Sequence, residues 1–159
     1  MTQDELKKIV EYKDGELYWK ISPNWSIKVG DKVGYLTKDG YKRTTINKKN
    51  EKLHRLIFLY HYGYYPQLID HIDGNGINNK IENLREVSHM QNSQNKKMAI
   101  NNTSGSKNVY WHNAVKKWTV VLTLNKKKKV IGYFEDLELA DLVAQEARNK
   151  YFGAYARHL

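Results

Sequence analysis

Apolar residues recur at a helical period in three segments of this chain. The first follows Thr2 and Glu5, whose spacing is that of a capping box, and it predicts a short helix near residues 3–12. The second lies in EKLHRLIFLYHYG and the third in LELADLVAQEARNKYFG, and each run ends at a glycine that can terminate a helix. Each of these helices would present one apolar face to a core.

Alternating and β-branched runs predict strands between the helices. GELYWK is typical of one strand, while VGYLT and YKRTTIN flank a Lys-Asp-Gly turn that indicates a hairpin. LIDHID and ENLREVS flank the loop GNGINN, and Ser88 can cap a helix through HMQNSQNKKMAI. After the polar breaker NNTSGSK, the runs NVYWHN, KKWTVVLTLN and KKVIGYFED predict three further strands. The fold class is therefore predicted to be α+β.

Composition supports a folded chain of one medium or two small domains. The chain has 159 residues, of which 40% are hydrophobic and 12% aromatic, enough to build small cores. It has no cysteine, which excludes disulfide frameworks and cysteine-ligated zinc. The N-terminal segment lacks the apolar core of a signal peptide, and no apolar run approaches membrane-spanning length. We therefore expect no membrane partner and a cytoplasmic location.

The charge points to a polyanionic partner. The formal net charge is +10 and the isoelectric point is about 9.6, a balance that favours nucleic acid. The excess of basic residues lies in residues 21–66 and 101–159, while residues 67–100 carry equal numbers of acidic and basic side chains. A neutral middle suits a site that must hold a cation, and basic flanks suit contacts with phosphates.

The segment LIDHIDGNGINNKIENLREVSHMQNSQN combines an Asp-His pair with many amides. Asp70 and His71 are neighbours on one predicted strand, so their side chains leave opposite faces. A hairpin followed by a helix can bring a helical residue back against one of them. The order of elements therefore allows a metal site shared between strand and helix, with a histidine beside it.

HRLIF, LIDHIDGNGINNKIENLREV and QNSQN together resemble the phage and homing branch of the HNH endonucleases, which carry a ββα-metal (His-Me finger) motif. The resemblance covers about residues 53–97. It implies catalytic roles for His71 and Asn83, with His71 as the general base, and metal ligation by Asp70 and Asn92. Carboxylate and amide oxygens suit Mg²⁺ or Mn²⁺, the cofactor that we expect.

Further residues of this region remain candidates. His89 and Asn95 each lie one helical turn from Asn92, so either is an alternative third residue of the motif. His54 matches the family pattern in HRLIF and is equally suited to a packing role. Arg55 is a candidate phosphate contact or a solvated helix residue.

Residues 104–157 resemble the apetala-type (ERF-like) DNA-binding domain, a three-stranded antiparallel sheet packed on one helix. In that family the sheet lies in the major groove, which makes several sheet residues candidate DNA contacts. Sheet packing is the alternative for the two aromatic residues among them, and a solvated turn is the alternative for the lysine run. The candidates are Lys107, Tyr110, Lys117, Trp118, Thr119, Lys127 and Lys128.

These two resemblances imply an HNH nuclease domain at residues 1–100, with a leader at 1–52, a linker at 101–106 and an apetala-type domain at 107–159. The expected function is metal-dependent hydrolysis of DNA, and we expect the DNA to be double-stranded. The enzyme would be a monomeric endonuclease, either homing-like or free-standing and phage-encoded, in the cytoplasm of the host cell. The alternatives are a non-catalytic DNA-binding regulator and a nuclease that acts on RNA.

Overall fold

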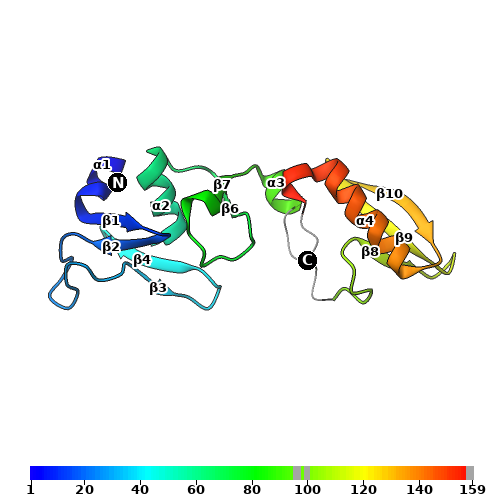
Figure 1. Ribbon diagram of the computed structural model, residues 1–159, viewed down its shortest axis with the longest axis horizontal. Coiled ribbons are helices and arrows are strands. Elements are labelled where there is room, and N and C mark those ends of the chain that lie inside the picture. Colours follow the sequence, from blue (N-terminus) through cyan, green and yellow to red (C-terminus); the bar gives the residue numbers. More distant parts are fainter. Residues whose placement is uncertain (95–97, 99–100, 157–159) are drawn as a thin grey trace. The chain divides into compact units, whose positions relative to one another are not determined.

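The computed structural model describes residues 1–94, 98 and 101–156. Helices and small antiparallel sheets alternate along the chain, so the predicted α+β class is confirmed (Figure 1). The chain divides into two compact units, residues 1–88 and 89–159, which are described separately below. None of the described helices is long and apolar enough to cross a membrane.

The first unit begins with the predicted capping box. Helix α1, Gln3–Ile9, is capped by Thr2, whose side chain accepts a hydrogen bond from the Glu5 backbone while Glu5 binds the Thr2 backbone N–H in return. The helix ends three residues earlier than predicted, because Val10 starts strand β1, Val10–Lys13. Strand β1 pairs with β2, Glu16–Trp19, and this pairing places Val10 opposite Trp19.

A second antiparallel sheet in this unit has the order β3-β4-β5, formed by Tyr35–Leu36, Lys42–Ile46 and Lys49–Lys52. Helix α2, Leu53–Tyr62, follows β5 without a loop and ends at Gly63, which takes the left-handed conformation expected of a helix stop. The core joins helices α1 and α2 to these two sheets. Its fully buried residues are Leu6, Val10, Leu17, Val33, Leu53, Leu56, Ile57 and Leu59.

The third sheet of the first unit, a pair of short strands, carries the Asp-His segment. Strand β6, Ile69–His71, pairs antiparallel with β7, Leu84–Glu86. The connection between them ends in a short 3₁₀ helix, η1, Ile81–Asn83. Leu84 is buried in the core of the unit, so the hairpin is fixed to the rest of the fold. The predicted strand-loop-strand order is confirmed.

The second unit begins with helix α3, His89–Gln94, and contains a three-stranded antiparallel sheet. The sheet has the order β10-β9-β8, formed by Val109–His112 (β8), Lys117–Leu124 (β9) and Lys127–Phe134 (β10).

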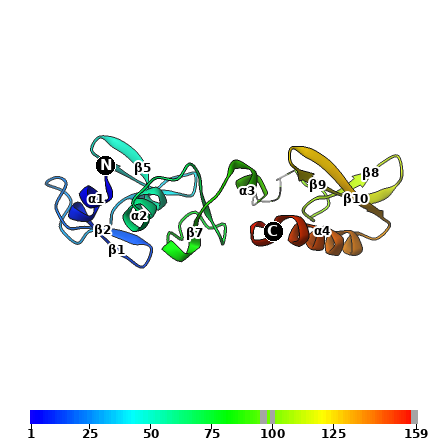
Figure 2. The same ribbon diagram turned by 90° about the horizontal axis from the view of Figure 1, so that it is seen from above.

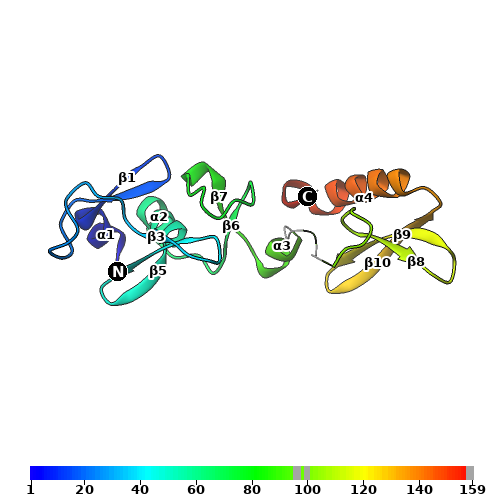
Figure 3. The same cartoon turned by 90° about the horizontal axis from the view of Figure 1, so that it is seen from below.

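Helix α4, Leu137–Phe152, covers one face of this sheet and ends at a second 3₁₀ helix, η2, Gly153–Tyr155 (Figures 2 and 3). Val120 and Leu122 of β9 are fully buried against the alanines of α4. The predicted sheet with one packed helix is confirmed.

Two details of this unit bear on the sequence expectations. Within the predicted linker, residues 101–106, the Asn102 side chain accepts hydrogen bonds from Ser104 and Gly105 in a turn, and the linker role stays a prediction. The turn between β9 and β10 is only Asn125 and Lys126, both with positive φ. The following lysines therefore lie on strand β10 and not in a loop.

Gly34 provides a test of the packing between β3 and β4. Its φ is +91°, and a Cβ atom there would lie 2.7 Å from the Arg43 carbonyl oxygen. The Gly34→Ala variant is expected to lose about 1–3 kcal/mol of unfolding free energy beyond the strain of the left-handed backbone. Gly40→Ala is the matched control, because Gly40 has a φ of +79° and no atom lies within 4 Å of the position that its Cβ would take. Equal losses in urea denaturation would contradict the contact.

Candidate active site on the β6–β7 hairpin

The hairpin register places Asp70 and His71 on opposite faces of β6, as the strand alternation predicts. Asp70 lies opposite Arg85, whose Nε and Nη2 donate to the same carboxylate oxygen, Oδ2, at 2.9 and 2.8 Å. The side chain of Asp70 is 11% exposed and that of Arg85 17%. Asp70 is thus oriented by a sheltered ion pair, an interaction that the sequence pattern does not predict.

His71 is buried and contacts an amide of the loop. Its Nε2 lies 3.0 Å from Oδ1 of Asn79, and the two residues are 5% and 1% exposed. Within the described part of the chain, the Asn79 Nδ2 group is buried without a hydrogen-bond partner. The sequence does not indicate this contact, because a spacing of eight residues across a hairpin loop does not show which amide folds back onto the strand.

Asn83 closes the loop between the two strands. Its Oδ1 accepts from the Asp73 backbone at 3.0 Å, and its Nδ2 donates to Asp73 Oδ1 and to the Asn78 carbonyl at 2.9 and 2.8 Å. Asp73 also accepts from the Asn75 backbone and from the Asn78 side chain. Burial raises the pKa of Asp73, but these hydrogen bonds outweigh it and leave the pKa below its ordinary value.

His54 lies beside His71. The two rings meet edge to face, with centroids 5.1 Å apart, and Tyr41 contacts both rings. His54 is 6% exposed. Burial, together with the nearby charges of Lys52 and Arg55, lowers the pKa of His54 to about 3, so the ring is neutral near neutral pH. His54 therefore packs against the predicted base as an uncharged ring.

Arg55 is partly engaged within the fold. Its Nη2 donates to the Pro66 carbonyl at 3.1 Å, and its guanidinium lies 5.5 Å from the centroid of the Tyr65 ring. These contacts fix the segment that follows α2. The predicted phosphate contact of Arg55 stays a prediction.

The predicted third residue of the motif lies on α3, in the second unit. Asn92 is half-buried and His89 is exposed, while Asn95 lies outside the described residues. The sharing of one cation between Asp70 and Asn92 therefore stays a prediction. Among the described residues, no group of three or more His, Asp or Glu side chains is placed to hold a metal ion.

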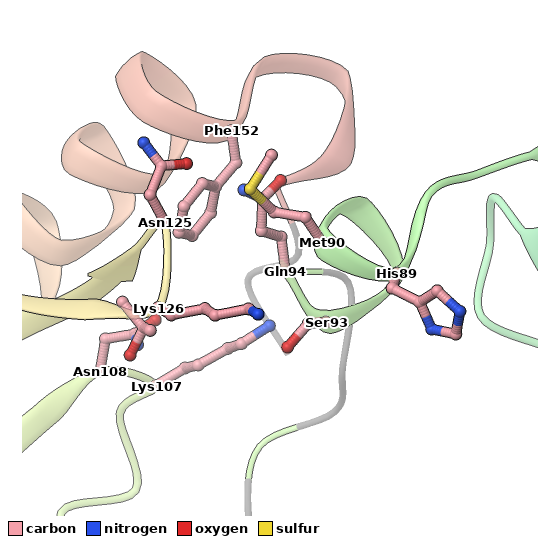
Figure 4. Close-up of a pocket in the computed structure, with 10 residues that line it drawn as sticks. His89, Met90, Ser93, Gln94, Lys107, Asn108, Asn125, Lys126 and Phe152 are labelled. Atoms are coloured by element: carbon pink, nitrogen blue, oxygen red, sulfur yellow. The ribbon is translucent and has the colours of Figure 1, made fainter.

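A cavity of about 670 Å³ opens within the second unit between α3 and the β9–β10 turn. Figure 4 shows Lys107 and Lys126 extending side by side toward Ser93, with Phe152 on the opposite wall. His89 lies at the outer edge of this cavity. The backbone carbonyl of Lys107, one of the predicted DNA contacts, also accepts a hydrogen bond from the buried Arg148 at 2.5 Å.

The face of the β8–β10 sheet opposite α4 carries a groove of about 340 Å³. Tyr110, Thr119 and Lys128 line it, and the strand register places Lys117 on the same face. Thr119 is 4% exposed, and in the described part of the chain its buried Oγ1 has no hydrogen-bond partner. Lys117 forms an ion pair with Glu135 at 3.1 Å. Four of the predicted contacts thus share one surface.

Two predicted DNA contacts lie on the other side of this sheet. Trp118 packs against the core under α4 and meets Trp111 edge to face at 5.1 Å. Lys127 pairs with Leu124, whose side chain faces the helix, so Lys127 points away from the groove. Trp118 thus shows the sheet packing that was the alternative to a DNA contact, and Lys127 lies on strand β10 and not in the expected turn, so the DNA contacts of both residues stay predictions.

Comparison with known proteins agrees with the hairpin region. Residues 51–94 match the family model described as HNH endonuclease, and the chain belongs to the HNH endonuclease family. A relative is protein 3.8 of Escherichia phage T7, which is 36% identical over 97 residues, a match that covers 60% of this chain and 75% of the relative.

A solved structure that describes DNA binding and cleavage by the HNH homing endonuclease I-HmuI is 30% identical, with a TM-score of 0.41. The match covers 55% of this chain and 51% of that one, so this chain corresponds to about half of that protein's length. The resemblance of residues 107–159 to the apetala type stays a prediction.

The neutral His54 predicts a pH dependence of stability. With a folded-state pKa of about 3 and an ordinary value of 6.5, only the unfolded chain binds this proton between those two pH values. The free energy of unfolding should therefore fall by about 1.4 kcal/mol per pH unit as pH drops below 6.5. The His54→Phe variant should lose this contribution in urea denaturation between pH 6.5 and 5. Identical slopes for both chains would contradict the assignment.

Proposed function

We propose that this chain is a metal-dependent endonuclease that hydrolyses DNA phosphodiester bonds, by nicking or by double-strand cleavage. The observation that supports it most directly is the His71–Asn79 pair beside Asp70, on a hairpin inside the segment that matches HNH endonucleases. A phosphodiester resists hydrolysis because its charge repels nucleophiles and its alkoxide leaves poorly. Catalysis needs a base for the attacking water and stabilisation of charge at the phosphate.

His71 is the base in this proposal. In the tautomer suited to that role, Nε2–H donates to Asn79 Oδ1, which leaves the lone pair of Nδ1 for the proton of water. Asn79 thereby orients the ring and selects the nitrogen that reacts. The neutral His54 ring supports the imidazole from the side without adding charge. Asn83 acts indirectly, because its hydrogen bonds hold the loop that carries Asn79.

The donor chemistry of the site fits a hard divalent cation. Asp70 offers a carboxylate and Asn92 an amide oxygen, and Mg²⁺ and Mn²⁺ prefer such ligands while keeping several waters. Arg85 fixes the orientation of the Asp70 carboxylate through Oδ2, so the acid is held in one position on β6. When bound, the cation would supply Lewis-acid stabilisation of the phosphate and of the leaving 3′ oxygen. His89 remains the alternative to Asn92.

The second unit is proposed to bind DNA through the open face of its sheet. Tyr110, Thr119 and Lys128 line the groove there, with Lys117 on the same face. The groove combines a basic side chain, an aromatic face and a buried hydroxyl, a mixture suited to phosphates and base edges. A binding unit tethered to a nuclease raises the effective concentration of the nuclease at its target.

The relative in phage T7 supports a phage-encoded endonuclease, either free-standing or homing-like. In that role the chain would act in the cytoplasm of the host cell, as a monomer on duplex DNA. One active site per chain makes a nick the natural product of a single visit.

Supercoiled plasmid provides the direct test of the activity. With Mg²⁺ or Mn²⁺, the wild-type chain is expected to convert it to nicked or linear DNA, and EDTA should stop the reaction. The His71→Ala variant should cut at least about 100-fold more slowly, since a general base contributes roughly 10²–10⁴-fold. Asn79→Leu should be impaired less, because the base remains but loses its orientation.

The same experiment separates the alternatives. Both variants should bind duplex DNA like the wild-type chain in an anisotropy assay with EDTA. Binding without cutting by the wild-type chain would favour a regulatory protein, and preferential cutting of RNA would favour an RNA nuclease. Undiminished cutting by His71→Ala would remove the catalytic assignment.

Charge reversal tests the binding face. Lys128→Glu should weaken duplex binding and lower the salt dependence of the affinity, because it removes a phosphate contact. Lys150→Glu makes the same change on α4, on the other side of the sheet, and should have a smaller effect. Equal losses in the two variants, measured by anisotropy titration at several salt concentrations, would argue against the groove as the DNA contact.

A further inference from the structure

The loop between β2 and β3 exposes a tryptophan almost completely. Trp25 is 98% exposed, while Trp19, at the start of the same connection, is 5% exposed in the core. Ile21 and Val29 in this loop are also exposed, by 54% and 65%. A single exposed apolar residue needs no explanation, but three of them on one loop, including an almost fully exposed indole, mark a candidate binding surface.

Trp25 belongs to a structured turn. Oδ1 of Asn24 accepts hydrogen bonds from the Ser26 backbone, the Ser26 hydroxyl and the Ile27 backbone, at 2.8–3.1 Å. The Ser22 hydroxyl contacts the carbonyls of Asn24 and Ile27, both at 2.5 Å. The residues on both sides of Trp25 are therefore fixed by a local network, and the indole is presented from a defined backbone.

The ends of the loop are anchored to the core of the first unit. Gly30 donates to the Trp19 carbonyl at 2.7 Å, and Trp19 donates to the Asp31 carbonyl at 3.0 Å. Ile27 packs against the core cluster beneath. The loop projects from the sheets of its unit in all three ribbon views (Figures 1 to 3). Preorganisation of this kind lowers the entropy lost when a ligand binds.

The charge around the indole selects the ligand. Lys20, Lys28 and Lys32 flank it in sequence, and the Lys20 ammonium donates to the Lys7 carbonyl at 2.9 Å. The one acidic residue between them, Asp31, accepts a hydrogen bond from the Lys28 backbone. The Lys32 ammonium lies 3.9 Å from Glu16 and is 62% exposed. An aromatic face among exposed ammonium groups matches a base flanked by phosphates.

We infer that this loop, residues 20–32, is a nucleic-acid contact in which the Trp25 indole stacks on a base while the neighbouring lysines bind phosphates. In duplex DNA the indole acts as a wedge at a base step that the bound protein opens. The inference rests on the proposed function, since it adds a contact in the first unit to the DNA surface of the second. The alternative is that the loop binds a protein, in which case the indole would make an apolar contact and would not stack on a base.

Three substitutions of Trp25 separate these occupants. Affinity for a fluorescently labelled duplex is measured by anisotropy on the full chain in EDTA, which prevents metal-dependent cutting. Trp25→Ala and Trp25→Leu should each bind at least about fivefold more weakly, because both lose the stacking surface. Trp25→Phe should stay within about twofold of the wild-type affinity, because it keeps an aromatic face. The ring is exposed, so circular dichroism should be unchanged in all three variants.

The outcomes separate this inference from the nuclease assignment when plasmid cutting is measured in parallel. A wild-type chain that cuts plasmid while Trp25→Ala binds with unchanged affinity would overturn the inference alone. Weaker binding by Trp25→Ala in a chain that never cuts would support the contact and count against the nuclease. If Trp25→Leu binds the duplex with the same affinity as Trp25→Phe, stacking is not involved. A wild-type chain without affinity for the duplex would also overturn the inference.

Discussion

The site depends on the register of one short hairpin. Pairing of β6 with β7 sends Asp70 to Arg85 on one face and His71 to the interior on the other. A slip of one residue would exchange these faces and remove both contacts. The buried Leu84 fixes the hairpin to the core, and the Asn83 amide closes its loop. These contacts hold the register of the hairpin, which the backbone hydrogen bonds of two three-residue strands could not hold alone.

This constraint explains the many asparagines of the segment. An amide both donates and accepts, so it can satisfy loop backbone groups and side chains at once without adding charge beside the proposed cation site. Asn83 and Asn78 use that capacity within the loop around Asp73. Asn79 uses it toward His71. The same residue type thus shapes the loop and orients the imidazole.

Much of the fold could be predicted because it depends on local patterns. The capping box at Thr2, the stop at Gly63 and the alternation around Asp70 and His71 are all decided by neighbours in sequence. Contacts between distant residues could not be predicted. Three examples are the Arg85 ion pair, the packing of His54 on His71 and the placement of Trp118 under α4. They depend on strand register and tertiary packing, which cannot be predicted from a single sequence. The exposure of a single aromatic ring likewise emerges only once the core is known.

The proposed cation site takes Asp70 and one residue of α3 as ligands, with His71 as the neighbouring base. Calorimetric titration of Mn²⁺ into the intact chain tests it, with Asp70→Ala, Asn92→Ala and His89→Ala as variants. The account predicts that Asp70→Ala and Asn92→Ala each weaken binding by about tenfold or more, while His89→Ala binds like the wild-type chain. Unchanged Mn²⁺ affinity in Asp70→Ala would contradict the account.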